Sequence, residues 1–289
     1  MIKVINIFFI VLLITVQAST QHLSDTIPFV LTPFNNIYVE TVLNEVDTLN
    51  LMFHTGESGA TITEKAFERI TKLDSVIAAS TESWGGKGDG KILQNNQLQI
   101  GSSFFHKLTV WVNKRSGQLT DGKFGPKLFA GKMLEIDYNK HLFIVHTAFK
   151  KEQLKGYQKF KLVQKNGLYF IKGKVVIGRK KIPQLFMVHT GYGGNVLLDD
   201  AFAKKHNLNK VLEIVDKSVL TDAYGNELVT QKALLPNFQL GKNVLNDLSI
   251  SFFSGAIGRQ KISVLGNGVF KQFNSILNVD KGIVYLKPV

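Results

Sequence analysis

The sequence predicts a mostly β protein made of two related halves, and two observations lead to this fold class. The tripeptide His-Thr-Gly occurs twice, at residues 54–56 and 189–191, each time directly after an apolar run. Short segments that alternate apolar and polar residues, typical of half-buried strands, account for much of the remaining chain. A duplicated strand-then-turn element indicates two halves that face each other and bring the two histidines to equivalent places.

The first element is a hydrophobic segment at the N-terminus. Lys3 precedes an apolar run over residues 4–14, and residues 16–18 have the small-residue pattern of a cleavage site. The run is shorter than the roughly 20 residues that a membrane-spanning helix needs. We therefore expect residues 1–18 to be a signal peptide, the mature protein to be periplasmic or secreted, and no stable membrane span to remain after cleavage.

Strands are the main expected elements of the rest of the chain. Residues 37–43 and 108–112 alternate in period two, and residues 167–181 read as a hairpin around Gly178. Helical signals are few and short, and two of them open with a capping residue, Thr63 or Asp199. The expected helices cover residues 63–70, 126–131, 199–206 and 268–273.

Four elements recur in the same order along the chain, with an offset that grows only from 135 to 141 positions. Such order indicates an internal duplication. We expect an N-terminal lobe over residues 19–150 and a C-terminal lobe over residues 151–289, joined near residues 149–158. The recurring pairs are residues 54–59 with 189–194, 81–85 with 221–225, 98–101 with 238–241, and 123–129 with 264–270.

Composition narrows the function classes. The chain has no cysteine, which excludes disulfides, a thiolate nucleophile and cysteine metal sites. Its net charge of +13 favours anionic neighbours. However, the lysines are dispersed and no stacked aromatic–basic motif accompanies them, so we expect no nucleic-acid partner. We also expect a monomer.

At the tripeptides the chain resembles the retropepsin-like aspartic proteases, in their two-lobed single-chain bacterial form. In that family each lobe carries an apolar strand ending in Asp-Thr-Gly and, later, apolar residues before a glycine that packs on the catalytic loop. Residues 54–56 and 189–191 match the first feature with histidine in place of aspartate, and Gly125 and Gly266 match the second. The resemblance covers most of residues 27–289. It implies an all-β fold of two pseudo-twofold-related, retropepsin- or pepsin-like β-barrel lobes with short helices.

The departure from the family lies in its chemistry. Family members use two aspartates, one from each lobe, that share a proton and hold the attacking water. His54 and His189 occupy both positions here. The dyad's charge would change from about −1 to 0 or +1, and the larger rings would displace the water by an ångström or more, which can cost on the order of 100-fold in rate. We therefore expect a catalytically inactive relative, a pseudoenzyme that needs no cofactor.

The resemblance also implies how the site is supported and how a ligand is held. Thr55 and Thr190 are expected to bond across the lobe interface, while Gly56 and Gly191 allow the tight turns. Glycine-rich flaps with aromatic tips would close over a ligand, and such a cleft can hold an extended peptide by strand addition. The expected flap residues are Trp84, Gly85, Tyr224 and Gly225.

Three functions remain open from the sequence. The leading one is binding of a peptide or an extended polymer in the interlobe cleft without cleavage. The alternative is an active peptidase or hydrolase that uses the His54/His189 pair, or zinc or copper held there with help from Glu57. The third is a structural envelope component with a basic surface. An open cleft would favour binding, a third ligand near both histidines would favour metal chemistry, and a plugged cleft would favour the structural role.

Overall fold

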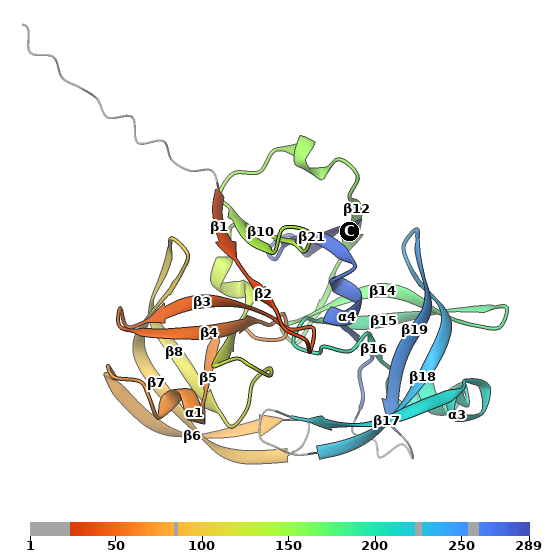
Figure 1. Ribbon diagram of the computed structural model, residues 1–289, viewed down its shortest axis with the longest axis horizontal. Coiled ribbons are helices and arrows are strands. Elements are labelled where there is room, and N and C mark those ends of the chain that lie inside the picture. Colours follow the sequence, from red (N-terminus) through yellow and green to blue (C-terminus); the bar gives the residue numbers. More distant parts are fainter. Residues whose placement is uncertain (1–23, 84–85, 223–226, 254–259) are drawn as a thin grey trace, which may run out of the picture.

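The computed structural model describes residues 24–83, 86–222, 227–253 and 260–289. Over these residues the chain is mostly β and forms two eight-stranded sheets and one six-stranded sheet. Figure 1 shows the two larger sheets as the two wings of the molecule, with the smaller sheet between and above them. The predicted fold class, two β-barrel lobes with short helices, is confirmed.

The first eight-stranded sheet is built from residues 30–124, in the order β2-β3-β4-β9-β5-β8-β7-β6. An additional pairing of β3 with β7 curls it toward a barrel. Its strands are β2 (Val30–Leu31), β3 (Ile37–Leu43), β4 (Asp47–Phe53), β5 (Ala60–Thr63), β6 (Ser75–Ser83), β7 (Gly86–Ile100), β8 (Ser103–Asn113) and β9 (Gly122–Phe124).

The second eight-stranded sheet is built from residues 163–266, in the order β13-β14-β15-β20-β16-β19-β18-β17, with an additional pairing of β14 with β18. Its strands are β13 (Val163–Lys165), β14 (Leu168–Ile177), β15 (Lys180–His189), β16 (Val196–Leu197), β17 (Ile214–Thr221), β18 (Glu227–Leu240), β19 (Asn243–Phe253) and β20 (Val264–Gly266). The hairpin expected at residues 167–181 is present as β14 and β15, which turn at Gly178 with φ +57°.

The two large sheets repeat each other strand for strand. Strands β2 to β9 have the same neighbours, in the same order, as β13 to β20, and β4–β9 and β15–β20 are parallel in both. This match accounts for the sequence repeat. One detail differs from the expected alignment. The backbone oxygen that accepts from Gly125 belongs to Gly59, and the one that accepts from Gly266 belongs to Asn195. Gly59 therefore corresponds to Asn195, because the second loop is one residue longer.

The six-stranded sheet joins the two halves of the chain. Its order, β1-β11-β10-β21-β22-β12, takes three strands from each half. At its centre β10 pairs antiparallel with β21, so that Leu134 lies opposite Leu277. The strands are β1 (Ser24–Pro28), β10 (Met133–Asp137), β11 (Leu142–His146), β12 (Gln158–Lys161), β21 (Phe273–Asn278) and β22 (Ile283–Pro288).

Helices in the described residues are short, and the expected caps are present. Thr63 accepts a hydrogen bond from the Ala66 backbone N–H (3.1 Å), and Asp199 accepts one from that of Phe202 (2.8 Å). The sequence did not predict α3. The helices are α1 (Glu64–Phe67), α2 (Asp200–Lys205), α3 (Leu208–Val211) and α4 (Asn267–Phe270), with 3₁₀ turns η1 (Pro126–Phe129) and η2 (Lys151–Leu154). Within the described ranges, no helix is both long enough and apolar enough to cross a membrane.

The core fixes where the first tripeptide begins. Phe53, at the end of β4, packs against Phe124 and Phe143, with ring centroids 5.5 and 5.1 Å apart. All three side chains are fully buried. Because burying an aromatic ring contributes strongly to stability, Phe53 anchors the strand end and His54 begins the turn at a defined point.

A buried polar contact adds to the connection between the halves. The Tyr138 hydroxyl, beyond β10, donates to the Asn267 side-chain oxygen (2.6 Å), and the Asn267 amide donates to the backbone oxygen of Asn35 (2.6 Å). Burial raises the pKa of Tyr138 above its ordinary value, so the hydroxyl keeps its proton as a donor. Tyr138 and Asn35 thus hold the start of α4.

Tyr138→Phe should destabilise the protein by about 1–3 kcal/mol, because the Asn267 side-chain oxygen would stay buried without its donor. Urea unfolding of the purified protein measures this loss. Tyr285→Phe is the matched control, since Tyr285 is partly exposed and should change stability by less than about 0.5 kcal/mol. Equal midpoints for the two variants would contradict the structural role of the Tyr138 hydroxyl.

Candidate functional site

Two threonines join the tripeptide loops. The Thr55 hydroxyl donates to the backbone oxygen of Val188 (2.7 Å), and the Thr190 hydroxyl donates to that of Phe53 (2.9 Å). Each hydroxyl also accepts from the other threonine's backbone N–H, both at 3.1 Å. Both threonines are buried. The four bonds form a closed two-fold arrangement that fixes the two loops against each other.

The same arrangement brings the two histidines together. The rings of His54 and His189 lie edge to face, with centroids 4.5 Å apart and planes at 67°. The Gly56 backbone N–H donates to His54 Nδ1 (3.1 Å), so the neutral ring carries its proton on Nε2. His189 Nδ1 is buried and has no hydrogen-bond partner among the described residues. The sequence-predicted pair therefore sits at the junction of the two halves.

Glycines shape the space around these rings. A methyl group at Gly191 would overlap the His54 ring, and one at Gly56 would crowd the same ring and Met187. The later glycines pack on the loops, since a methyl group at Gly125 would collide with the Glu57 backbone oxygen and one at Gly266 with that of Gly194. Each of the four expected glycine positions thus lies where a side chain has no room.

A loop of the first half also holds the second tripeptide loop. The Asn36 side-chain amide donates to the Gly191 backbone oxygen (3.1 Å), and that of Asn35 donates to the Gly193 backbone oxygen (2.8 Å). A methyl group at Gly193 would collide with the Phe34 backbone oxygen. Sequence reasoning missed these asparagines, and no local pattern marks them because their partners lie about 150 positions away.

A lysine–glutamate pair lies beside the histidines. Lys123 Nζ is 3.7 Å from Glu57 Oε2, and both side chains are largely buried. Burial lowers the pKa of Lys123 and outweighs the opposing effect of Glu57. The other Glu57 oxygen accepts from the Ser58 backbone N–H (3.0 Å). The sequence analysis also missed Lys123 as a site residue. The repeat could have indicated it, because Lys123 carries a charge at the position where the second half has the apolar Val264.

Both imidazoles are neutral at pH 7. Burial, followed by the charges of His189 and Lys123, lowers the pKa of His54 well below its ordinary value. Burial, followed by Lys123, lowers the pKa of His189 to about 4. A base this weak has little driving force to take a proton from water at neutral pH.

The described residues offer no complete metal site. They contain no cluster of three His, Asp or Glu side chains that could hold an ion. Glu57, the third ligand considered from the sequence, is engaged with Lys123 and its own loop. A structural or catalytic zinc site needs at least three protein ligands. His54 and His189 supply only two.

A cavity of about 1010 Å³ opens over the histidines. His54, Glu57 and Lys123 from the first half, and His189 and Tyr192 from the second, are among its lining residues. Ligand sites commonly occupy about 300–1,000 Å³, so the cleft is large rather than plugged. The expected flap residues Trp84, Gly85, Tyr224 and Gly225 fall outside the described residues, and their role stays a prediction.

The two walls of the cleft differ in chemistry although their strands correspond. On the first wall, strand pairing aligns Met52, Lys123, Thr61 and Trp111 in one row, and all four line the cavity. The corresponding row of the second half is Met187, Val264, Leu197 and Ser251. The first three of these belong to an apolar cluster against which Tyr192 and Leu220 pack. The row of the first half thus brings the Lys123 charge to the cavity, whereas the row of the second half is not among the lining residues and packs against Tyr192 and Leu220, which are.

Comparison with solved structures supports the fold. An aspartic proteinase from Irpex lacteus matches with a TM-score of 0.60, covering 92% of this chain and 97% of the proteinase at 13% identity. At this identity the likeness shows the fold alone, which is the bilobal fold of an aspartic proteinase. No family profile matches the sequence, and no curated protein is similar enough to count as a match.

Gly191→Ala should destabilise the protein by about 1–3 kcal/mol or more, since the new methyl group overlaps the His54 ring in a packed interface. In the double variant with His54→Ser the clash is absent, so the two effects should be strongly non-additive in urea unfolding. Gly59→Ala is the control, because a methyl group there meets no atom within 4 Å. Additive effects would show that the ring does not occupy this space.

His189→Asn should make stability less dependent on pH between 7 and 4. The unfolded histidine binds a proton below about pH 6.5, whereas the folded one binds it only near pH 4. The native protein therefore loses stability as pH falls through this window, by on the order of 3 kcal/mol for this residue. Unfolding by urea at several pH values measures the difference, and His106→Asn, at an exposed position, is the control. Parallel curves for wild type and His189→Asn would contradict a lowered pKa of His189 in the folded protein.

Proposed function

We propose that this chain is an exported, aspartic-protease-like protein that binds a peptide or an extended polymer in the cleft between its two lobes and does not cleave it. In this proposal residues 1–18 are removed as a signal peptide, and the lobes are residues 19–150 and 151–289. The retropepsin-like character of the chain, its periplasmic or secreted location and its monomeric state belong to the same proposal.

The observation that carries the proposal is the open cavity flanked by two sheet edges. Strands β6 and β17 are the terminal strands of the two large sheets. Ser80 of β6 and residues 219–221 of β17 line the cavity. Figure 1 shows both strands on the side of the molecule away from the six-stranded sheet. An extended chain can pair with unpaired backbone groups at such edges.

The histidine pair is the reason to expect no cleavage. A shared-proton carboxylate dyad supplies one base and one acid at the same time. The neutral imidazoles of His54 and His189 instead provide two weak bases and no carboxylate. The alternative is a peptidase or hydrolase that uses this pair or a metal held there. One observation favours it: His189 Nδ1 is buried and has no hydrogen-bond partner among the described residues.

The test is incubation of the purified mature protein with a mixed peptide library from pH 3 to pH 8, with and without zinc and chelator. Mass spectrometry reads the products, and retention of unmodified peptides on immobilised protein reads binding. We expect retention without cleavage. Products that disappear in His54→Ala would overturn the inactive assignment and favour the hydrolase. If peptides were neither retained nor cleaved, the proposed function of the cleft would lose its support.

His54→Asp combined with His189→Asp should restore cleavage with an acid optimum, because it recreates a carboxylate dyad on loops that are already joined. Each single change should leave cleavage absent, since one carboxylate cannot act as both acid and base. The same library assay detects the products. A folded double variant without activity would show that Lys123 or the cleft walls have also been altered beyond use, and adding Lys123→Val distinguishes these two cases.

A further inference from the structure

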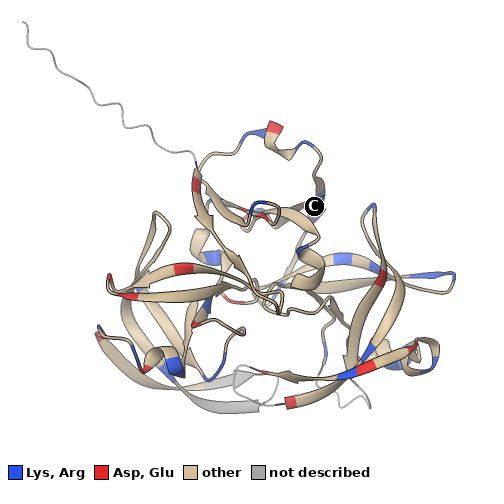
Figure 2. Cartoon of the chain, viewed as in Figure 1, with Lys and Arg blue, Asp and Glu red and all other residues tan. Residues whose placement is uncertain are grey.

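All of the basic side chains that line the cavity among the described residues come from one side. They are Lys65, Lys114, Arg115 and Lys123, each in the first half of the chain. Lys123 is paired with Glu57. We call the other three, Lys65, Lys114 and Arg115, the cationic rim. Figure 2 shows basic segments at α1 and in the loop beside it. None of the three has an ion-pair partner in the described part of the chain.

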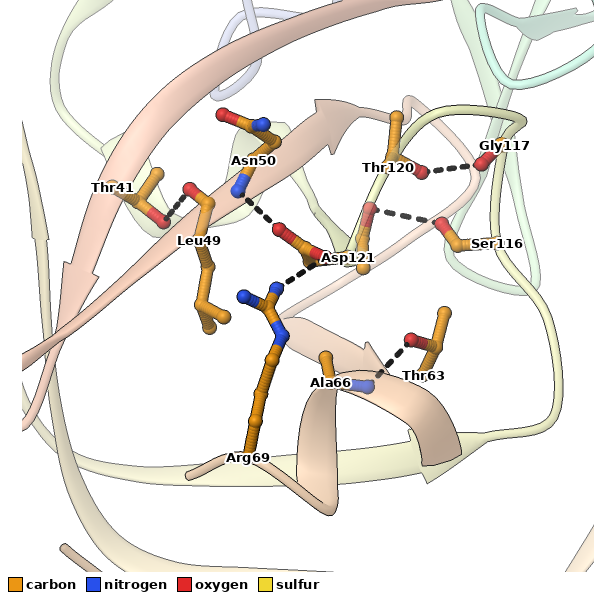
Figure 3. Close-up of polar contacts among 11 residues, drawn as sticks. Thr41, Leu49, Asn50, Thr63, Ala66, Arg69, Ser116, Gly117, Thr120 and Asp121 are labelled. Carbon is orange, nitrogen blue, oxygen red and sulfur yellow. Dashed lines mark hydrogen bonds and ion pairs between the residues drawn. The ribbon is translucent and has the colours of Figure 1, made fainter. Parts of the chain in front are cut away.

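An ion pair and a hydrogen bond fix the helix that carries Lys65, the first residue of the cationic rim. Arg69, just after α1, forms an ion pair with Asp121, and Asp121 accepts from the Asn50 backbone N–H (2.8 Å). Figure 3 shows this contact together with the Thr63 cap of α1. The helix that carries Lys65 is therefore tied to the strand that leads into the cleft floor.

The loop that carries Lys114 and Arg115 is fixed by the same network. The Ser116 hydroxyl donates to the Gly122 backbone oxygen (2.9 Å). The Thr120 hydroxyl donates to that of Gly117 (2.6 Å), as Figure 3 shows. Asp121, which pairs with Arg69, directly follows this loop. These bonds order the backbone that carries the exposed side chains of the rim, and an ordered backbone loses less conformational entropy when a ligand binds.

A second observation on the same wall also indicates a missing partner. Thr61 lines the cavity, is only 3% exposed, and its hydroxyl has no hydrogen-bond partner among the described residues. A buried hydroxyl without a partner costs free energy unless a ligand or water satisfies it. Strand pairing sets Thr61 between Lys123 and Trp111. The first half of the chain thus contributes to the cavity lining both a hydroxyl without a hydrogen-bond partner and three cations without ion-pair partners among the described residues.

The lining residues from the second half of the chain are mostly uncharged. Tyr192, Val219 and Leu220 line the cavity there, and Asp222 is the one charged lining residue that the described second half contributes. Successive side chains of an extended peptide point to opposite sides, with a repeat of about 7 Å for every second residue. An acidic polysaccharide carries its charges without apolar side groups, so it matches only the first wall.

We propose that the cleft takes an extended acidic peptide, with carboxylate side chains toward the cationic rim and apolar side chains toward Tyr192, Val219 and Leu220. This inference rests on the proposed binding function. It adds a ligand class, because the rim selects for charge and the second wall selects for apolar residues at alternate positions. Charged rims act mainly on association rate and salt dependence.

The experiment compares three dye-labelled octapeptides that alternate valine with glutamate, glutamine or lysine. Fluorescence anisotropy with the purified mature protein gives each dissociation constant at low and moderate salt. We expect the glutamate peptide to bind about 10-fold more tightly than the glutamine peptide at low salt, as follows from a few exposed ion pairs of modest strength each. The lysine peptide should bind most weakly, and the advantage of glutamate should shrink as salt rises.

Two triple variants locate the effect. Lys65→Gln with Lys114→Gln and Arg115→Gln should reduce glutamate binding to the glutamine level and leave the glutamine peptide unchanged. Lys204→Gln with Lys205→Gln and Lys210→Gln removes the same charge from exposed positions on α2 and α3, and should preserve the glutamate preference. Loss of the preference in this control would overturn the rim as its source.

The remaining outcomes separate the two proposals. Equal binding of all three peptides would overturn the acidic-peptide inference and leave the cleft as a binding site. A labelled oligogalacturonate, an acidic polysaccharide fragment, is tested in the same assay. If it binds and the triple rim variant abolishes this binding, while no peptide binds, the choice of a peptide would be overturned. Absence of binding by every probe would overturn both the inference and the proposed function.

Discussion

The hydrogen bonds between Thr55 and Thr190 are the constraint on which the site depends. They are the point where two loops 135 positions apart become one structure. Each hydroxyl both donates and accepts, so neither loop can satisfy its threonine alone. Burial makes an unmade bond costly, and this holds His54 against His189 with little freedom. Both histidines line the cavity, which therefore lies at the place where the two loops meet.

This rigid meeting point changes what the first residue of each tripeptide can do. Two carboxylates in such a place share a proton and retain a negative charge. The two imidazoles give up their charge instead, since burial and the nearby Lys123 both oppose protonation. The floor of the cleft is therefore neutral. The positive charge of the site comes from basic side chains of the first half of the chain. Glu57 compensates only that of Lys123.

Much of the fold could be predicted from the sequence because its signals are local or repeated. Strand β3 has the bounds that its alternation predicts, and Thr63 and Asp199 cap helices at matching places. The row of Lys123, Thr61 and Trp111 could not be predicted, since it depends on the register between strands that are far apart in sequence. The single extra residue in the second loop was hidden by the glycines around it. The contacts of Asn35 and Asn36 likewise arise only when the halves are assembled.

The unequal walls also make the two possible directions of a bound chain different, although the fold is duplicated. Two identical lobes would offer a bound chain the same surroundings when it is turned end for end, so both directions would be equally populated. Lys123 and Thr61 line the cavity from the first half, whereas Val264 and Leu197 occupy the corresponding positions in an apolar cluster of the second half, so the two directions differ in energy. A difference of about 1.4 kcal/mol already favours one direction tenfold. The divergence of one row of side chains thus gives a symmetric scaffold a sense of direction.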